Sequence, residues 1–220
     1  MGKLIVIDGL DGSGKHTQRE RLYDALTSNG IEAYKISFPD YESPGCIFVK
    51  EYLGGAFGEN ADDTSAYSAS LFFGLDRFYS YRKGWKSLIE KEGVYILADR
   101  YTSANAVHQL SKLPEEEWDT FLTWLWDTEF EKLGLPLPDA VIYLELLPEI
   151  SIDLIKKRSV IENRAMDIHE RDSEHLFKSY KAAMYASEKL GWKRIRCYEN
   201  GKIRSVEDIS SEILDFVNSL

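Results

Sequence analysis

The sequence of 220 residues contains only two cysteines and no apolar run that approaches the ~20 residues needed to cross a bilayer. Cys46 and Cys197 supply neither a disulfide framework nor a four-ligand zinc site, so we expect two buried free thiols in a reducing compartment. The apolar run at residues 4–7 ends at Asp8 and is too short for the core of a signal peptide. These absences predict a cytoplasmic protein with no membrane association.

Positive charge is also scarce: the sequence has 27 Lys and Arg residues and 37 Asp and Glu residues, which gives a formal net charge of −10. A general nucleic-acid-binding protein needs a basic face, so we expect no nucleic-acid partner. A small anionic substrate in a local basic pocket remains compatible with this balance. The length allows one domain or two small ones, and no linker divides the chain, so we expect a single domain over residues 1–220.

Apolar, β-rich runs alternate with helical patterns along the chain. This alternation is typical of an α/β fold, a mainly parallel sheet with helices on both faces. The first run is a continuous Leu-Ile-Val-Ile stretch of the kind that is buried on both faces of a sheet. We expect five strands, at residues 3–8, 31–38, 94–98, 139–146 and 194–199.

Helical patterns fill the intervals between the predicted strands. Asp62 or Asp63 is expected to cap a long helix that runs to about Lys83. Residues 115–132 repeat large apolar residues, several of them Trp, at helical spacing. This aromatic stripe indicates core packing or a subunit interface rather than a cofactor site.

A glycine-rich segment, Gly9-Leu-Asp-Gly-Ser-Gly-Lys-His-Thr17, follows the first predicted strand directly. Its glycines let the backbone wrap around an anion with the N–H groups directed inward, and the next helix adds the positive end of its dipole. Lys15 can reach the β- and γ-phosphates of a nucleotide. The segment predicts a phosphate-binding loop with these binding residues: Gly9, Asp11, Gly12, Ser13, Gly14, Lys15, His16 and Thr17.

One position of this loop departs from the usual pattern. Its last residue is normally Ser or Thr, whose hydroxyl binds Mg²⁺, but here it is His16, with Thr17 one residue later. Two hypotheses follow. Either phosphates, water and a carboxylate at a strand end hold the metal, or the loop binds phosphate without catalysis. The remaining motifs favour the first.

The third predicted strand is followed by Asp99, Arg100 and Tyr101. In a doubly wound sheet, ligands bind beyond the carboxyl ends of the strands, so we expect this tripeptide to face the same crevice as the phosphate-binding loop. Asp99 can hold a magnesium-bound water, and Arg100 can bind phosphate with two hydrogen bonds. A simple ion pair between the two residues is the alternative, and the neighbouring loop favours the functional interpretation.

Phe73 and Arg77 are neighbours on one face of the long predicted helix. An aromatic ring and a guanidinium can stack on a nucleobase and hydrogen-bond its edge. Such a pair is more often a core Phe beside a surface Arg, so it is weak evidence alone. Two further pairs are equally weak in isolation: Phe38 with Tyr41, and Asn105 with His108.

Residues 159–169 are polar and charged and lie between two predicted helices. They follow a cationic run that ends at Arg158, and they include Arg164. A charged run of this kind is usually a solvated face, but it is also a candidate lid.

Together, these motifs resemble those of the thymidylate kinases, P-loop enzymes that phosphorylate dTMP with ATP. The resemblance extends from residue 9 to residue 171, with the motifs in the family order. It implies a P-loop NTPase fold of the nucleotide-kinase type and the conversion of dTMP to dTDP by in-line phosphoryl transfer, in dTTP biosynthesis. It further implies ATP and Mg²⁺ as cofactors, dTMP and ATP as small-molecule substrates, and a homodimer.

The resemblance also assigns roles around the phosphates. Lys15 and the loop amides hold the donor phosphates, Asp99 anchors Mg²⁺ through water, and Arg100 holds the acceptor phosphate. Asp11 orients the acceptor sugar. Since position 12 is Gly and the loop has no arginine of its own, Arg158 or Arg164 is expected to stabilise the transferring group.

Other roles concern the acceptor nucleotide. By resemblance, Phe38 and Tyr41 line its phosphate, Phe73 stacks on thymine, and Arg77 hydrogen-bonds thymine O4. Asn105 contacts the base, and His108 lies against the deoxyribose, where the family often has Tyr or Phe.

Two alternatives stay open at this point. Another nucleotide or deoxynucleoside kinase could share the fold, and a nucleoside kinase would need a carboxylate base near the acceptor hydroxyl. A non-catalytic nucleotide-binding protein is the other alternative, with His16 as the mark of lost metal binding.

Overall fold

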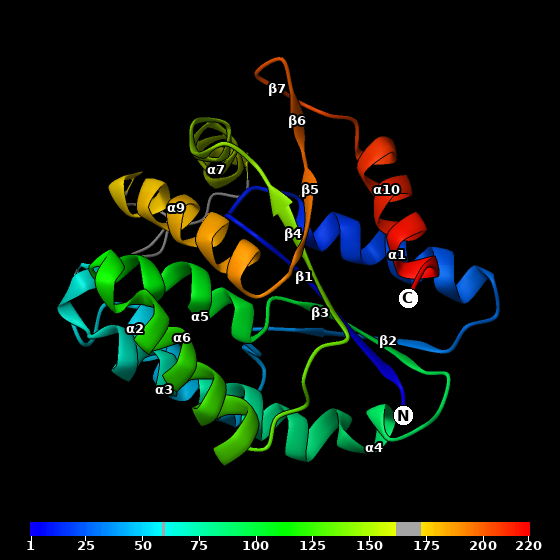
Figure 1. Cartoon of the computed structure of the whole chain (residues 1–220), viewed down its shortest axis with the longest axis horizontal. Helices are drawn as coiled ribbons and strands as arrows, with labels where there is room; N and C mark the ends of the chain where they lie inside the picture. Colours follow the sequence, from blue (N-terminus) through cyan, green and yellow to red (C-terminus); the bar gives the residue numbers. More distant parts are fainter. Residues whose placement is uncertain (59, 162–172) are drawn as a thin grey trace.

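The computed structural model describes residues 1–58, 60–161 and 173–220. At its centre, five parallel strands form a sheet in the order β2-β3-β1-β4-β5 (Figure 1). Their bounds are Lys3–Gly9 for β1, Ala33–Ser37 for β2, Tyr95–Asp99 for β3, Ala140–Glu145 for β4 and Lys193–Arg196 for β5. The predicted α/β class and its parallel sheet are confirmed.

Helices surround the sheet on both sides (Figure 1). Within the described ranges, two π-helical turns extend them, since Tyr81–Trp85 joins α3 to α4 and Asp127–Lys132 continues α6. The helices are α1 Lys15–Ser28, α2 Ile47–Leu53, α3 Ala66–Ser80, α4 Lys86–Ile89, α5 Thr102–His108, α6 Trp118–Trp126, α7 Pro148–Ile161, α9 Ser173–Lys189 and α10 Val206–Asn218.

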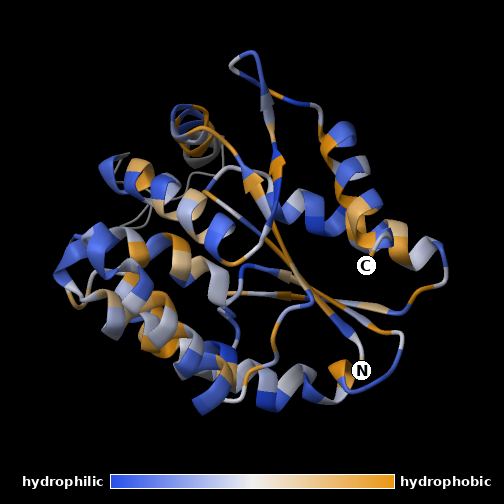
Figure 2. Cartoon of the chain, in the orientation of Figure 1, coloured by the Kyte–Doolittle hydropathy of each residue, from blue (hydrophilic) through white to orange (hydrophobic). Residues whose placement is uncertain are grey.

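Strand β1 shows how the apolar pattern builds the two layers of the core. Successive side chains of a strand point to opposite faces. Ile5 and Ile7 therefore pack with residues of α1 and α10, whereas Leu4 and Val6 pack with α4 and the turn before it. All four are fully buried, and Figure 2 shows the hydrophobic colouring concentrated along the central strands.

The strand register places the predicted functional segments at one edge of the sheet. Ile7 of β1 lies opposite Asp99 of β3, and Ser37 of β2 also pairs with Asp99. The phosphate-binding loop after β1, the tripeptide that begins at Asp99 and the segment that begins at Phe38 therefore start beside one another. Parallel pairing of non-consecutive strands thus assembles a single crevice from distant parts of the chain.

The beginning of α3 differs from the prediction. Asp62 and Asp63 lie in a separate 3₁₀ turn, and the residue that caps α3 is Ser65, whose hydroxyl accepts a hydrogen bond from the Ser68 N–H. The Asp63 carboxylate instead accepts from the backbone N–H of Asn60 at 2.9 Å. The acidic pair was the wrong choice because both residues lie in the preceding turn, which the Asp63 side chain closes.

The fifth strand is also shorter than predicted, since β5 ends at Arg196. Beyond it, β6 (Tyr198–Glu199) pairs antiparallel with β7 (Lys202–Ile203) to form a small hairpin. The sequence pattern does not separate β5 from β6, because Ile195 and Tyr198 continue the apolar pattern on the two sides of Cys197.

Most of the aromatic stripe of α6 lies in the core, whereas Trp126 is exposed. Its residues Trp118, Phe121, Leu122 and Leu125 are buried against α5 and α9, which confirms packing as its role. Both cysteines are free and fully buried, as predicted, and burial raises the pKa of each thiol to about 12. Among the described residues, no helix combines the length and the apolar composition that a membrane span requires.

The cap of α3 gives a stability prediction. Replacing Ser65→Ala removes the acceptor for the Ser68 N–H, so the free energy of unfolding should fall by about 1 kcal/mol in chemical denaturation. Asp62→Ala is the matched control and should change it by less than about 0.5 kcal/mol, because Asp62 is exposed and does not cap α3. Equal losses for the two variants would contradict this capping assignment.

Candidate active site

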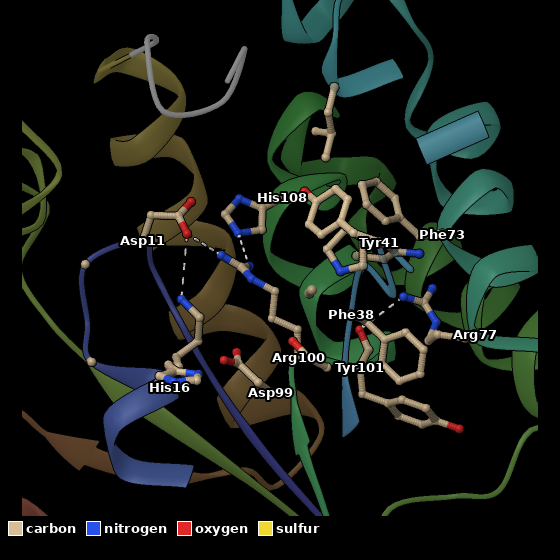
Figure 3. Close-up of a pocket in the computed structure, with 18 of the residues that line it drawn as sticks. Asp11, His16, Phe38, Tyr41, Phe73, Arg77, Asp99, Arg100, Tyr101 and His108 are labelled. Atoms are coloured by element: carbon tan, nitrogen blue, oxygen red, sulfur yellow. Dashed lines mark hydrogen bonds and ion pairs between the residues drawn. The ribbon is translucent and has the colours of Figure 1, made fainter. Parts of the chain in front are cut away.

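A cavity of about 740 Å³ opens at the edge of the sheet where β1, β2 and β3 end (Figure 3). Its volume is within the range of small-molecule sites. Most of the residues predicted from sequence line it: Asp11, Gly12, Gly14, Lys15, His16, Thr17, Phe38, Tyr41, Phe73, Arg77, Asp99, Arg100, Asn105 and His108. The structure therefore brings together residues that are scattered over nearly 100 positions of the chain.

Among the described residues, two predicted site residues are not part of this lining. Gly9 is the last residue of β1, and Ser13 is buried within the loop. Arg164 and residues 162–169 of the predicted lid lie outside the described residues, as does the side chain of Arg158 near the end of α7.

The phosphate-binding loop has the backbone that its glycines predict. Gly12 and Gly14 have φ angles of 80° and 87°, in the left-handed region that L side chains rarely adopt, and Gly14 is the N-cap of α1. Lys15 is the first residue of α1, and its Nζ donates to the carbonyls of Gly9 (3.0 Å) and Leu10 (2.9 Å). The loop is therefore an ordered turn that presents a helix N-terminus to the cavity.

Helix α7 packs against the phosphate-binding loop. A Cβ atom added to Gly12 would lie 3.2 Å from Cβ of Leu154, and the Ser151 hydroxyl donates to the carbonyl of Asp11. The absence of a side chain at position 12 thus permits close contact between the loop and α7.

A chain of charged groups crosses the floor of the cavity (Figure 3). Arg100 Nη2 lies 2.5 Å from Asp11 Oδ1, and its Nη1 lies 2.8 Å from His108 Nε2. Lys15 Nζ is 3.7 Å from the same Asp11 oxygen. Burial raises the pKa of Asp11, but the positive charges of Arg100 and Lys15 outweigh burial and lower this pKa well below its usual range. Burial and the Arg100 charge lower the pKa of Lys15.

Arg100 is also held by its backbone and by a second carboxylate. Its φ angle is +65°, which is uncommon for a residue other than glycine and is typical of functional sites. Asp8, fully buried, lies 3.9 Å from Arg100 Nη1 and accepts from Ser103 Oγ at 2.6 Å. Burial raises the pKa of Asp8. Sequence reasoning missed Asp8 and Ser103 as site residues, although Asp8 interrupts an otherwise apolar strand.

The other end of the cavity is aromatic. Phe38 is buried and packs on Tyr101 with ring centroids 5.9 Å apart, and Phe73 meets Tyr52 edge to face. Arg77 is only 1% exposed, so it is not the surface residue that its pattern most often indicates.

Glu129, a buried carboxylate that sequence reasoning missed, links the polar residues at this end of the cavity. Glu129 accepts two hydrogen bonds from Arg77, through Nε (2.8 Å) and Nη2, and one from the Asn105 amide (3.2 Å). No local pattern distinguishes Glu129, because it lies in a charged segment near the end of a packing helix.

The arrangement defines a class of protein. A P-loop at the end of the first strand of a parallel sheet, with a basic group and an aromatic pocket in the same cavity, is the architecture of a P-loop nucleotide kinase.

Comparisons with known proteins identify the family. A family model described as thymidylate kinase matches residues 7–208. The thymidylate kinase of Mycobacterium tuberculosis (strain H37Rv) is 33% identical over 185 residues, 83% of this chain and 84% of that protein. That of Schizosaccharomyces pombe is 27% identical and covers 100% of this chain and 93% of its own length. The thymidylate kinase structure from Candida albicans superposes with a TM-score of 0.71 at 20% identity, covering 99% of this chain and 92% of that one.

This chain belongs to the thymidylate kinase family. It is therefore a nucleoside monophosphate kinase, an enzyme that transfers phosphate, and the alternatives of a nucleoside kinase or a non-catalytic binding protein are not favoured.

The pairing of Asp11 gives a pH prediction. Because the folded-state pKa of Asp11 is depressed, its contribution to stability is present above the unfolded pKa and is lost as the pH falls below about 4. Urea denaturation between pH 4 and pH 2 should therefore show a shallower loss of stability for Asp11→Asn than for the wild type, by at most about 1.4 kcal/mol per pH unit. Asp24→Asn, at an exposed position of α1, is the control and should follow the wild type. Parallel acid curves for wild type and Asp11→Asn would refute the pairing.

Proposed function

We propose that this enzyme transfers the terminal phosphate of ATP to dTMP and so produces dTDP for dTTP biosynthesis. The observation that carries this proposal is a single cavity with a phosphate-binding loop at one end and the pair Phe73 and Arg77 at the other. Arg100 lies between them (Figure 3), where the phosphate of a bound nucleoside monophosphate would meet the donor.

The chemistry needs charge compensation rather than a general base. The second pKa of a phosphate monoester is near ~6, so dTMP is mostly a dianion at neutral pH and is already a nucleophile. Two unit like charges ~4 Å apart repel by ~4 kcal/mol at an effective dielectric constant of 20, and each reactant carries more than one charge. The main task of the protein is therefore to place positive charge where the phosphates meet.

Lys15 and Arg100 supply this charge from the described residues. Lys15 and the loop N–H groups hold the donor phosphates, and Arg100 holds the acceptor phosphate. Asp11 and His108 bind the Arg100 guanidinium at 2.5 and 2.8 Å, which fixes its direction before the nucleotides arrive. Asp11 also orients the acceptor sugar, a role that rests on the family resemblance.

The residues fit a magnesium ion that is held mainly by phosphates and water. No group of three or more His, Cys, Asp or Glu side chains within the described ranges is arranged to hold a metal ion. Asp99 lines the cavity and can accept a hydrogen bond from a metal-bound water, whereas the exposed imidazole of His16 is a poor ligand for Mg²⁺. When bound, Mg²⁺ would neutralise part of the phosphate charge.

The acceptor nucleotide occupies the other half of the cavity. Phe73 stacks on the thymine ring, Arg77 donates to O4, and Asn105 meets the base edge. His108 lies against the deoxyribose. Phe38 and Tyr41 line the path of the acceptor phosphate; the first is buried and the second is half exposed at the cavity wall.

Three assignments stay predictions: the first rests on the cationic run before the predicted lid and on the family resemblance, and the other two rest on the length and composition of the sequence. Arg158 or Arg164 stabilises the transferring phosphate from a lid at residues 159–169. Residues 1–220 form one domain, and the enzyme works in the cytoplasm.

We also propose a homodimer that forms through α2 and α3. Leu71, Leu75 and Tyr79 are exposed at successive turns of α3, and Ile47 and Phe48 are exposed on the neighbouring α2. Exposed apolar residues concentrated on adjacent helices are typical of a protein–protein contact. Trp126 of α6 is also exposed, but most of the α6 stripe is buried in the core, so we assign this surface to α2 and α3.

The proposed reaction is tested by ADP release in a coupled assay with dTMP, dUMP, dCMP, dGMP and thymidine as acceptors. We expect turnover with dTMP to exceed that with dCMP and dGMP at least tenfold and thymidine to be inactive. Lys15→Met should lower kcat at least 100-fold, because it removes charge that the transition state requires. Turnover with thymidine alone would indicate a nucleoside kinase, and nucleotide binding without any turnover would contradict the proposal.

The proposed interface is tested by sedimentation velocity. The double variant Leu71→Glu and Leu75→Glu should sediment as a monomer, because two charges would be buried between the copies. Leu137→Glu, at a leucine that is 50% exposed outside these helices, should remain dimeric like the wild type. A monomeric wild type would contradict the proposal.

A further inference from the structure

Four hydrogen-bond donors converge on the Glu129 carboxylate, although its side chain is only 1% exposed. Oε1 accepts from Arg77 Nη2 and from Asn105 Nδ2 at 3.2 Å. Oε2 accepts from Arg77 Nε at 2.8 Å and from the Thr102 hydroxyl at 2.7 Å. These four donors occupy the acceptor directions of the two oxygens and leave none for water.

Stability is a poor explanation for this arrangement. Removing two charges from water costs several kcal/mol per ion, and apolar residues of the same volume often stabilise a core equally well or better. Glu129 does not line the cavity itself, but Arg77 and Asn105 both do. The carboxylate therefore lies directly behind the two polar groups that face the proposed base.

The contacts of Arg77 leave few of its hydrogens free. Nε and one hydrogen of Nη2 bind Glu129, and one hydrogen of Nη1 binds the Tyr101 carbonyl at 3.3 Å (Figure 3). A guanidinium has five N–H groups, so one hydrogen on each Nη remains for the cavity. Arg77 is thus fixed as a donor with a defined direction.

The contacts of Asn105 leave it as an acceptor toward the cavity, whereas those of Arg77 leave a donor. Its Nδ2 donates one hydrogen to Glu129 and the other to the Ser70 carbonyl at 3.3 Å. A rotated amide would place Oδ1 against two acceptors, so this orientation is set by its partners. Oδ1 therefore remains as the acceptor that Asn105 can offer to a ligand.

We infer that Glu129 is the positioning residue that sets the hydrogen-bond pattern of the base pocket, with a donor from Arg77 beside an acceptor from Asn105. This inference rests on the proposed function. A 4-oxo pyrimidine presents an acceptor at O4 and a donor at N3–H, which complement this pair. A 4-amino pyrimidine such as cytosine presents a donor at N4 and an acceptor at N3. The Arg77 donor would then face another donor, and the Asn105 oxygen would face another acceptor. Glu129 thus selects the 4-oxo group and is indifferent to the 5-methyl group.

The test is Glu129→Gln. Because both carboxylate oxygens accept from Arg77, the Gln amide must turn its NH₂ group toward an Arg77 donor in either orientation. Calorimetric affinities should show dTMP binding weakened at least tenfold and the dTMP-to-dCMP affinity ratio reduced at least tenfold. The dTMP-to-dUMP ratio and the KM for ATP should stay at wild-type values. Glu131→Gln, at an exposed position of the same helical turn, should leave all four quantities unchanged.

A second variant keeps the test decisive if an unpaired Arg77 prevents folding. The pair Arg77→Met and Glu129→Gln leaves no buried charge, and the Gln amide oxygen can still accept from Asn105 Nδ2. Its dTMP affinity should therefore match that of Arg77→Met alone, because the remaining effect of Glu129 acts through Arg77. An unchanged dTMP-to-dCMP ratio in folded Glu129→Gln, or additive losses in the double variant, would overturn the inference. Because affinity is measured without turnover, a wild type that binds dTMP but does not phosphorylate it would count against the proposed function and not against Glu129.

Discussion

The structure depends on arginines that carboxylates hold in fixed directions at the cavity. An arginine aimed at a phosphate or a base must keep one direction while the site is empty, and water does not provide that constraint. Here Asp11 and Asp8 hold Arg100, and Glu129 holds Arg77. Each carboxylate lowers the electrostatic cost of a buried guanidinium and fixes its plane. Binding then requires little rearrangement of the charges, which is the condition for strong electrostatic stabilisation of a transition state.

The topology of the sheet explains why these groups meet. The central strand β1 pairs with β3 on one side and β4 on the other, so the loop after β1 lies between residues that follow it by about 90 and 135 positions. The left-handed backbone of Arg100 then turns its side chain toward the loop. The order of the parallel strands thus brings the segments that follow them together, and these segments supply the side chains of the site.

The parts of the fold and the site that depend on short segments of the chain could be predicted from the sequence. The glycine-rich loop and the buried strand before it follow from backbone sterics and apolar runs, and Phe73 with Arg77 follows from helical spacing. Ser65 was missed because Asp62 and Asp63 have equally good capping chemistry, and only the course of the preceding turn decides between them. Glu129 was missed for a different reason, since its importance comes entirely from partners that lie 24 to 52 positions away.

The two buried thiols have a practical consequence for the study of this molecule. With a pKa of about 12 and no exposed surface, neither Cys46 nor Cys197 is reactive at neutral pH in the native state. An alkylating reagent can reach them only when the surrounding segment opens. Cys46 lies at the start of α2, and Cys197 lies in the core beneath α10. Their separate labelling rates therefore measure the local opening of two different regions of the protein without any introduced probe.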